Sequence, residues 1–120
     1  MASQGGVPDF SRVWAIIALH ESFDEATVAD LEREIRLLSG QRGARLIIEV
    51  SGLHFLDGYG IDVLVLLAHH MRRQGGLMAV VDGRGHARHV LGEAGLEDLL
   101  PLFPSVSEAM LALSGGEPPA

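Results

Sequence analysis

The stretch that decides the fold is residues 46–62, Leu46-Ile47-Ile48-Glu49-Val50-Ser51-Gly52-Leu53-His54-Phe55-Leu56-Asp57-Gly58-Tyr59-Gly60-Ile61-Asp62. Its apolar, branched first part predicts a buried strand over residues 45–50. Apolar residues at helical spacing follow, so we expect a helix over residues 59–73. Asp57 stands where a helix N-cap belongs. A strand-to-helix turn of this kind presents free backbone N–H groups and a positive dipole end, which suit a phosphate or a partner's carboxylate.

Three more segments have the composition of strands. Residues 13–19 form a continuous apolar run, which predicts a strand buried on both faces. Residues 77–81 form another apolar run of strand length. Residues 99–103 predict a weaker strand, and Pro101 within it suits an edge position.

Helical patterns separate and follow these strands. The first begins with a predicted capping box, in which Ser22 is the N-cap and Glu25 reaches back. A short helix is expected over residues 87–94, and a last one begins at a second capping box, Ser105 with Glu108. Strands that alternate with helices imply crossover connections. The sequence therefore predicts the α/β class, with a mostly parallel four- to five-stranded sheet and about four helices.

Length and composition predict one domain, over residues 12–113, in a chain of 120 residues. Residues 1–11 are expected to be a flexible lead without the features of a signal peptide, and residues 114–120 a disordered tail. No apolar run approaches the ~20 residues that span a membrane, so we expect a cytoplasmic protein without direct membrane insertion.

Charge and residue usage exclude several functions. The formal net charge of −7 disfavours nucleic-acid binding. The chain has no cysteine, and all nine basic residues are arginine, which removes thiolate and lysine chemistry. His86 and His89 have helical i,i+3 spacing, but no cysteine or suitably spaced acidic residue joins them, so we expect solvated histidines and no metal. No nucleophile, histidine and acid form a recognisable trio, so we expect no enzyme and no cofactor.

The quoted stretch resembles the STAS domain family, typified by bacterial anti-sigma factor antagonists. Family members show an apolar strand, then Asp-Leu-Ser-Gly, and then Asp-Ser-x-Gly-Leu; here these motifs read Glu49-Val50-Ser51-Gly52 and Asp57-Gly58-Tyr59-Gly60-Ile61. Residues 22–24, 91–96 and 103–109 also resemble family segments, so the resemblance spans residues 13–113. It implies a non-enzymatic module for transcription regulation. The implied partner is an anti-sigma factor that is also a serine kinase of the GHKL ATPase fold.

The chain departs from the family at the switch. The resemblance implies that the kinase phosphorylates the serine directly after the turn aspartate, which breaks docking, but this position is Gly58. The next position, often serine or threonine, is Tyr59. No phosphorylation is expected at Gly58, and we therefore expect binding that is constitutive or independent of phosphorylation. The family's extra edge strand would have to precede Arg12, which leaves a sheet edge open to another chain and makes a homodimer a further expectation.

The expected partner-binding surface combines the two turns before the first two helices, and more weakly residues 51–54. Its residues are Ser22, Phe23, Asp24, Asp57, Gly58, Tyr59, Gly60, Ile61 and Asp62. Asp57 also has a structural role as N-cap, and Gly60 eases a tight turn. Tyr59 is either a binding hot spot or a ring that packs across the turn. With either role for Tyr59, we expect these residues to lie at one end of the sheet.

Other readings of the chain stay open. Val63, Leu66 and Leu67 make the helix over residues 59–73 more apolar than one buried stripe requires, which favours a partner or dimer surface. Arg84, in the loop after the strand over residues 77–81, is expected at the same strand ends as Asp57. The rivals are a subunit of a phospholipid-transport ABC system, a stressosome-like scaffold, and a small-ligand or nucleotide sensor that uses the Arg84 loop.

Overall fold

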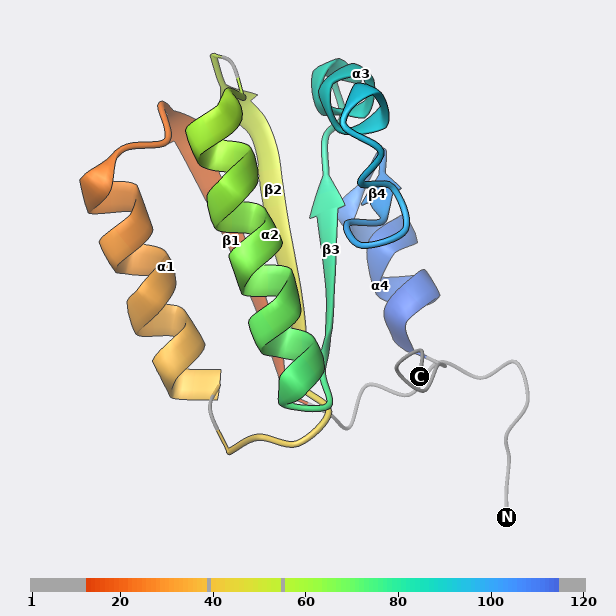
Figure 1. Cartoon of the computed structure of the whole chain (residues 1–120). Helices are drawn as coiled ribbons and strands as arrows, with labels where there is room; N and C mark the ends of the chain where they lie inside the picture. Colours follow the sequence, from red (N-terminus) through yellow and green to blue (C-terminus); the bar gives the residue numbers. More distant parts are fainter. Residues whose placement is uncertain (1–12, 39, 55, 115–120) are drawn as a thin grey trace.

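Strands and helices alternate in the computed structural model, which describes residues 13–38, 40–54 and 56–114. The predicted order of elements is confirmed. The elements are β1 (Trp14–Glu21), α1 (Glu25–Leu38), β2 (Arg45–Leu53), α2 (Gly58–Arg73), β3 (Leu77–Val81), α3 (His86–Glu93), β4 (Leu102–Phe103) and α4 (Val106–Ser114) (Figure 1).

The four strands form one sheet in the order β1-β2-β3-β4, and each neighbouring pair is parallel. Ile47 in β2 lies between Ile16 of β1 and Ala79 of β3, which fixes the register at the centre. The last strand is shorter than predicted and lies at the edge beside β3, as Pro101 suggested. The predicted α/β fold with a parallel sheet is thus confirmed, and all strand ends that lead into helices lie at one edge of the sheet.

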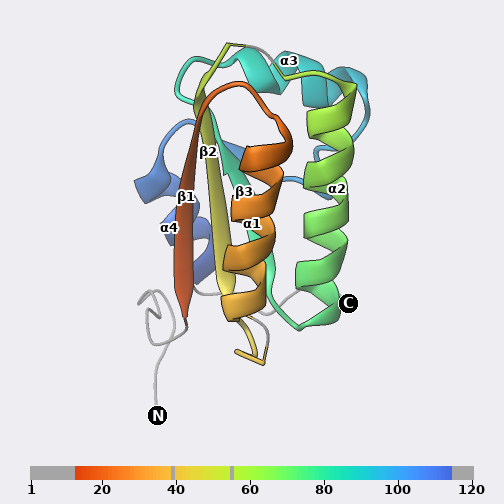
Figure 2. The ribbon, with the colours of Figure 1, turned by 90° about the vertical axis from the view of Figure 1, so that its left-hand side faces the viewer.

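Helices cover both faces of the sheet, as Figures 1 and 2 show. On one face, side chains of α1, α2 and α3 pack with alternate residues of β2, such as Leu46 and Ile48, in the larger core. On the other face, Ala109 and Leu113 of α4 pack on Ile47, Ala79 and Val81. Because both faces of β2 are covered, its near-continuous apolar run is explained.

The prediction that the first strand is buried on both faces is wrong. Ile16 is 48% exposed, and Ala18 is also exposed. The cause is the position of β1 at the edge of the sheet, since α4 is a short helix that packs over β2, β3 and β4. Within the described residues no strand pairs with the outer edge of β1, so the expected pairing with another chain stays a prediction.

Arg45, the first residue of β2, is fully buried. Its Nε donates to the carbonyl oxygen of Leu113 at 2.8 Å, and its Nη1 donates to that of Gly43 at 2.6 Å. The side chain therefore ties the start of the sheet to the end of α4. The bond to Leu113 satisfies a carbonyl group that the end of a helix leaves unpaired.

The last helix of the chain begins as predicted but ends later than predicted. Ser105 caps α4 as expected, because its Oγ accepts from the N–H of Glu108 at 3.2 Å. Ser114 belongs to α4 and is buried, so the helix extends one residue beyond the predicted domain end. The predicted lead over residues 1–11 and the remainder of the tail lie outside the described residues. No helix in the described part of the chain is long and apolar enough to cross a membrane.

Candidate functional site

The turns before α1 and α2 meet at the carboxyl end of the sheet, at the top of Figure 2. The rings of Phe23 and Tyr59 lie edge to face, with centroids 6.4 Å apart and an interplanar angle of 86°. A Cβ atom on Gly60 would lie 2.9 Å from Phe23 Cδ2 and from Leu56 Cδ1, so glycine permits this close approach. The two predicted parts of the binding surface are therefore brought into contact.

Asp57 caps α2, as predicted. Its side chain accepts from the N–H of Gly60 at 3.0 Å. The N–H groups of Gly58 and Tyr59 precede the intrahelical ladder and have no hydrogen-bond partner among the described residues. These donors, together with the positive end of the α2 dipole, remain for an acceptor on another molecule.

Tyr59 packs across the turn and is also partly exposed, so its position fits both roles that the sequence left open. Its ring makes a T-shaped contact with Phe23 across the turn, yet the residue is 48% exposed. Asp57, Gly58 and Asp62 are exposed beside it, whereas Ile61 is half-buried and packs against the larger core. The exposed part of the turn thus presents an aromatic ring flanked by two carboxylates.

Asp24, and not the predicted Ser22, caps α1. Its Oδ1 accepts from the N–H of Thr27 at 2.9 Å, while Ser22 contributes its backbone carbonyl oxygen to the Thr27 hydroxyl. Both residue types cap helices well, so the path of the backbone decides between them. That path turns at Glu21, which has a left-handed φ of 66° and is the only non-glycine residue of positive φ in the described ranges. A conformation of this kind is rare and concentrates at functional sites.

The hydrogen bond from the Thr27 backbone N–H is the largest cause that lowers the pKa of Asp24 below its ordinary value of 3.8. A carboxylate with a lowered folded pKa stabilises the fold above its unfolded pKa, and this contribution is lost as the pH falls through the folded pKa. We expect Asp24→Asn, which keeps a capping oxygen, to lower the free energy of unfolding at pH 7. The difference should disappear at pH values below the folded pKa. Urea unfolding of both proteins from pH 7 to pH 2 measures it, and a difference that is constant with pH would contradict the assignment.

Gly58 occupies open space. A Cβ atom there would meet nothing within 4 Å, and its φ is not in the left-handed region. Residues with a side chain therefore fit at this position without strain. The fold therefore does not require the glycine at the position where the resemblance places the phosphorylated serine.

The loop between β3 and α3 lies beside these turns, as predicted for Arg84. Asp82 is only 5% exposed, and its carboxylate accepts from the N–H groups of Arg84 at 2.9 Å and Ala87 at 2.6 Å. The N–H of Gly83 donates to Ser51 Oγ at 2.8 Å, and Arg84 Nη1 donates to the Ser51 carbonyl oxygen at 3.1 Å. The sequence placed Ser51 only in the weaker part of the expected surface, and sequence reasoning missed Asp82 as the residue that holds this loop. The signal available was an Asp-Gly pair directly after a predicted strand.

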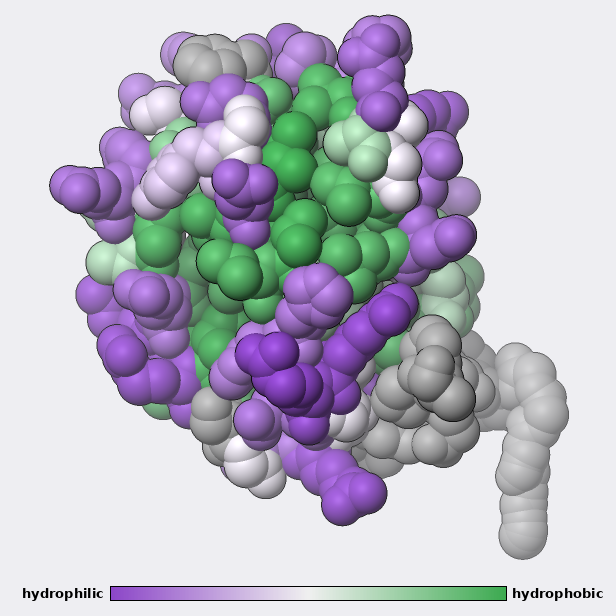
Figure 3. Space-filling model, viewed as in Figure 1, coloured by the Kyte–Doolittle hydropathy of each residue, from purple (hydrophilic) through white to green (hydrophobic). Residues whose placement is uncertain are grey.

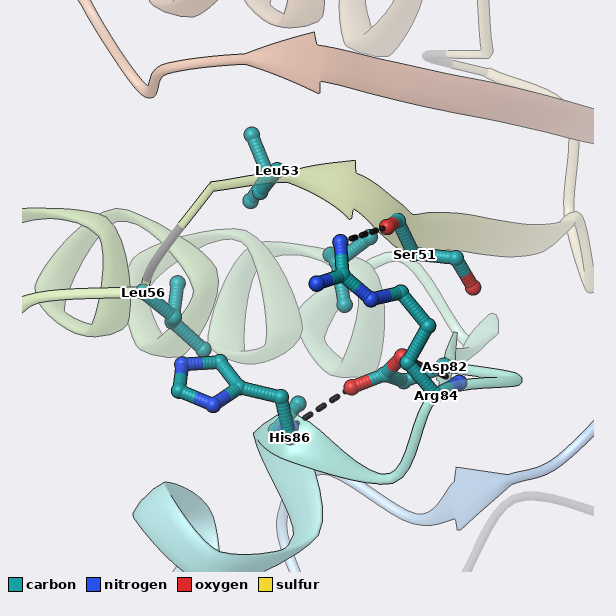
Figure 4. Close-up of a pocket in the computed structure, with 8 residues that line it drawn as sticks. Ser51, Leu53, Leu56, Asp82, Arg84 and His86 are labelled. Atoms are coloured by element: carbon teal, nitrogen blue, oxygen red, sulfur yellow. Dashed lines mark hydrogen bonds between the residues drawn. The ribbon is translucent and has the colours of Figure 1, made fainter.

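A small hollow lies between the ends of β2 and β3 and the start of α3 (Figure 4). The empty space there amounts to about 220 Å³ only when open solvent is included, and its enclosed part has room for about one water molecule. Its polar lining comes from Ser51, Asp82, Arg84 and His86, and its apolar lining from Val50, Leu53, Leu56 and Ala87. Leu56 directly precedes Asp57, so the hollow adjoins the α2 turn.

The face formed by α1 and α2 carries a broad hydrophobic area, over and beside α2, in Figure 3. Of the three extra apolar residues predicted for this helix, only Leu66 is prominent on the surface, at 67% exposed. Leu67 is buried and Val63 is half-buried. Two of these three apolar residues therefore pack in the core, and only Leu66 remains for an external surface.

The described residues contain no group of three or more histidine, aspartate or glutamate side chains arranged to hold a metal ion. Of the two histidines considered for a metal, His89 instead faces Glu93, with His89 Nε2 3.5 Å from Glu93 Oε2. Both side chains are largely exposed. We assign no metal ligand to either histidine.

Comparison with known proteins agrees with this architecture. An anti-sigma factor antagonist from Mycobacterium paratuberculosis matches with a TM-score of 0.68 and 21% identity, over 89% of this chain and 91% of that one. The protein TM1081 matches with a TM-score of 0.70 and 16% identity, over 92% and 90% of the two chains. The STAS domain of a SulP transporter from Vibrio cholerae matches with a TM-score of 0.68 and 21% identity, over 86% and 82%. At these identities the likeness shows the fold.

A comparison with curated proteins gives no significant match. A sequence model of the STAS domain, in contrast, matches residues 6–109, which is most of the chain. The matched range contains both turns of the candidate site and the Arg84 loop. The chain therefore belongs to the STAS domain family.

Proposed function

We propose that the chain is a non-enzymatic, protein-binding regulator that acts as an anti-sigma factor antagonist. STAS domains are generally binding modules, which supports a role in binding. The observation that carries the proposal is the contact between Phe23 and Tyr59, because it joins two turns into one exposed surface. The residues of this docking surface are Ser22, Phe23, Asp24, Asp57, Gly58, Tyr59, Gly60, Ile61 and Asp62.

The proposed partner is an anti-sigma factor with a GHKL-type kinase fold. Family resemblance supports this choice, as does the structural likeness to an antagonist of an anti-sigma factor. The helix end at Gly58 and Tyr59 offers two backbone donors, and the aromatic ring beside them is partly exposed. Exposed aromatic residues at the centre of an interface often supply much of its binding energy.

We further propose that this binding is independent of phosphorylation at the switch position. Gly58 has no hydroxyl group, so the kinase cannot add a phosphate there. Since no phosphate is added there, the surface keeps the charge of an unphosphorylated module. The module would then remain competent to bind at all times.

Substitution of Gly58 by serine is expected to create a phosphate acceptor without disturbing the fold. The new side chain enters open space at the first residue of α2, where the helix dipole favours an added negative charge. With the captured kinase and labelled ATP, Gly58→Ser should gain one phosphate on the peptide that contains residue 58, and the unsubstituted chain should gain none there. Labelling of Tyr59 in the unsubstituted chain would overturn phosphorylation independence.

Affinity capture from a lysate of the source organism, read by mass spectrometry, tests the proposed function. Recovery of a GHKL-type ATPase by the full chain supports it. Recovery of a transport ATPase or permease would instead favour a role in transport, a setting in which the SulP transporter shows a domain of the same fold. Recovery of neither class would overturn the assignment as an antagonist.

A further inference from the structure

The strand β2 changes its hydrogen-bonding alternation as it approaches the docking surface. At the start of the strand, the N–H of Arg45 donates to the Val13 carbonyl oxygen at 2.8 Å. Directly after its end, the N–H of His54 donates to the Glu21 carbonyl oxygen at 2.9 Å. Odd-numbered residues of β2 therefore face β1 at the start of the strand, whereas even-numbered residues face it at the end. One extra residue must lie between these two parts.

This extra residue makes a β-bulge, which is uncommon in a parallel pair of strands. Before the bulge, Ala18 of β1 pairs with Glu49 of β2. After it, His20 pairs with Gly52, so residues 50–51 lie opposite a single residue of β1. Bulges occur often beside functional sites, where they re-aim the side chains that follow.

The bulge reverses the faces of the residues after it. Alternate residues of β2 up to Val50 pack in the larger core, so strict alternation would turn Leu53 to the opposite face of the sheet. Leu53 is instead only 4% exposed and belongs to the same core as Val50. The path of the chain from β2 into the Asp57 turn thus depends on the bulge.

Glu49 supplies the hydrogen bond that the bulge would otherwise lose. The alternation that begins at Arg45 assigns the N–H of Ser51 to β1, but the extra residue moves this N–H out of register. The strand β3 offers no replacement, because its pairing with β2 ends at Glu49. The half-buried Glu49 accepts from the Ser51 N–H through its Oε1 at 2.6 Å. An N–H group without a partner costs stability, so this carboxylate stabilises the bulge.

The bulge is connected to both sides of the docking surface. On the side of β1, the N–H of His54 holds the carbonyl group of Glu21, whose left-handed φ turns the chain into residues 22–24. On the side of β3, the Ser51 hydroxyl accepts from the N–H of Gly83 at 2.8 Å, which holds the loop before α3. Figure 4 shows Ser51 at the end of β2, bonded to this loop.

We propose that Glu49 is a positioning residue of the docking surface and acts through the bulge in β2. This inference rests on the proposed function, because it assigns a residue that shapes the surface on which the partner docks. The Glu49 carboxylate fixes the backbone of Ser51, and the bulge in turn fixes the turn before α1 and the loop before α3. By alternation with Ile47, Glu49 lies on the face of β2 that α4 covers, so its effect reaches the surface through the backbone.

Hydrogen exchange followed by NMR tests this role without any partner. The reporters are the amide groups of His54 and Gly83, which lie on the two sides of the bulge and donate to groups other than Glu49. Glu49→Met, which has a similar size but no oxygen acceptor, should speed exchange at both reporters at least about tenfold. Exchange at Ile47, in the centre of β2, should stay within about twofold and shows that the fold is intact.

Three further variants isolate the hydrogen bond. Glu49→Gln keeps an oxygen acceptor and should leave both reporters within about threefold of the parent chain. Ser51→Ala removes only the hydroxyl, so exchange should become faster at Gly83 and stay within about twofold at His54. Glu34→Met makes the same chemical change at a half-buried glutamate of α1 and should change neither reporter. Unchanged exchange at either reporter in Glu49→Met, or equal changes in Glu34→Met, would overturn the proposal.

Binding of the captured partner gives the second arm of the test. Glu49→Met should raise the dissociation constant at least about tenfold, whereas Glu49→Gln and Glu34→Met should bind within about threefold of the parent chain. Faster exchange together with unchanged binding would overturn the positioning role and leave the proposed function standing. Failure to capture any partner, with faster exchange at both reporters, would support the control of these turns by Glu49 and count against the proposed function alone.

Discussion

Substitution of Gly58 by glutamate is expected to abolish binding of the partner. The new side chain begins at the exposed first residue of α2, in the middle of the proposed docking surface. It adds bulk where the partner approaches, and it adds negative charge beside Asp57 and Asp62. Uncompensated charge at an interface costs several kcal/mol, so we expect the dissociation constant to rise at least about 100-fold, which is about 2.7 kcal/mol. Calorimetric titration of the captured partner measures this change.

The same substitution is expected to leave the fold intact. No atom lies within 4 Å of a Cβ at position 58, and a carboxylate in the first turn of a helix interacts favourably with the dipole. The free energy of unfolding should therefore stay within about 0.5 kcal/mol of the parent value, as for other surface substitutions. Loss of binding with unchanged stability would identify a surface effect.

Two control variants separate the effect of the position on partner binding from the effect of the added charge. Gly58→Ala fills the same place without charge and should bind within a few fold of the parent chain. Ala112→Glu adds the same charge at an exposed position of α4, on the opposite side of the sheet from α1 and α2, and should bind normally. If Gly58→Glu binds as tightly as the parent chain, the Asp57 turn is not the interface and the site assignment is wrong.

The fold was predictable because each element carries a local signal. The apolar runs at residues 45–50 and 77–81 indicate strands, and Asp57 and Ser105 mark the helix starts that the structure confirms. The exposure of one face of β1, in contrast, was not predictable from a local signal. An apolar run indicates a strand, but its burial depends on the order of strands and on the length of α4. The burial of Arg45 depends likewise on a carbonyl group 68 residues away.

The candidate site was predictable where its residues lie in turns next to a recognisable helix start. The sequence alone placed residues 22–24 and 57–62 at one end of the sheet, and the Phe23–Tyr59 contact joins them. The bonds from Gly83 and Arg84 to Ser51 span 32 and 33 residues, and no local pattern indicates them. A hollow formed by such long-range contacts becomes visible only when the register of β2 and β3 is known.

Gly76→Ala is expected to destabilise the protein, and to do so more than Gly75→Ala, the other glycine-to-alanine change between α2 and β3. Gly76 lies where the chain leaves α2 and enters β3, and its N–H donates to the Met71 carbonyl oxygen at 2.8 Å. A Cβ atom there would lie 2.5 Å from the carbonyl oxygen of Ala44, which itself accepts from the N–H of Leu77 at 3.0 Å. Since backbone and not a flexible side chain blocks the methyl group, β2 and β3 must separate at their start.

Overpacking of this kind costs about 1–3 kcal/mol, so Gly76→Ala should lower the melting temperature by roughly 5–15 °C. The matched control is Gly58→Ala, the identical chemical change at a helical residue in open space, which should stabilise the chain by up to about 1 kcal/mol. Urea unfolding of the parent chain and both variants measures the difference. If the two variants have equal stability, the close approach between Gly76 and Ala44 does not limit packing, and the pairing of β2 with β3 tolerates a shift at its start.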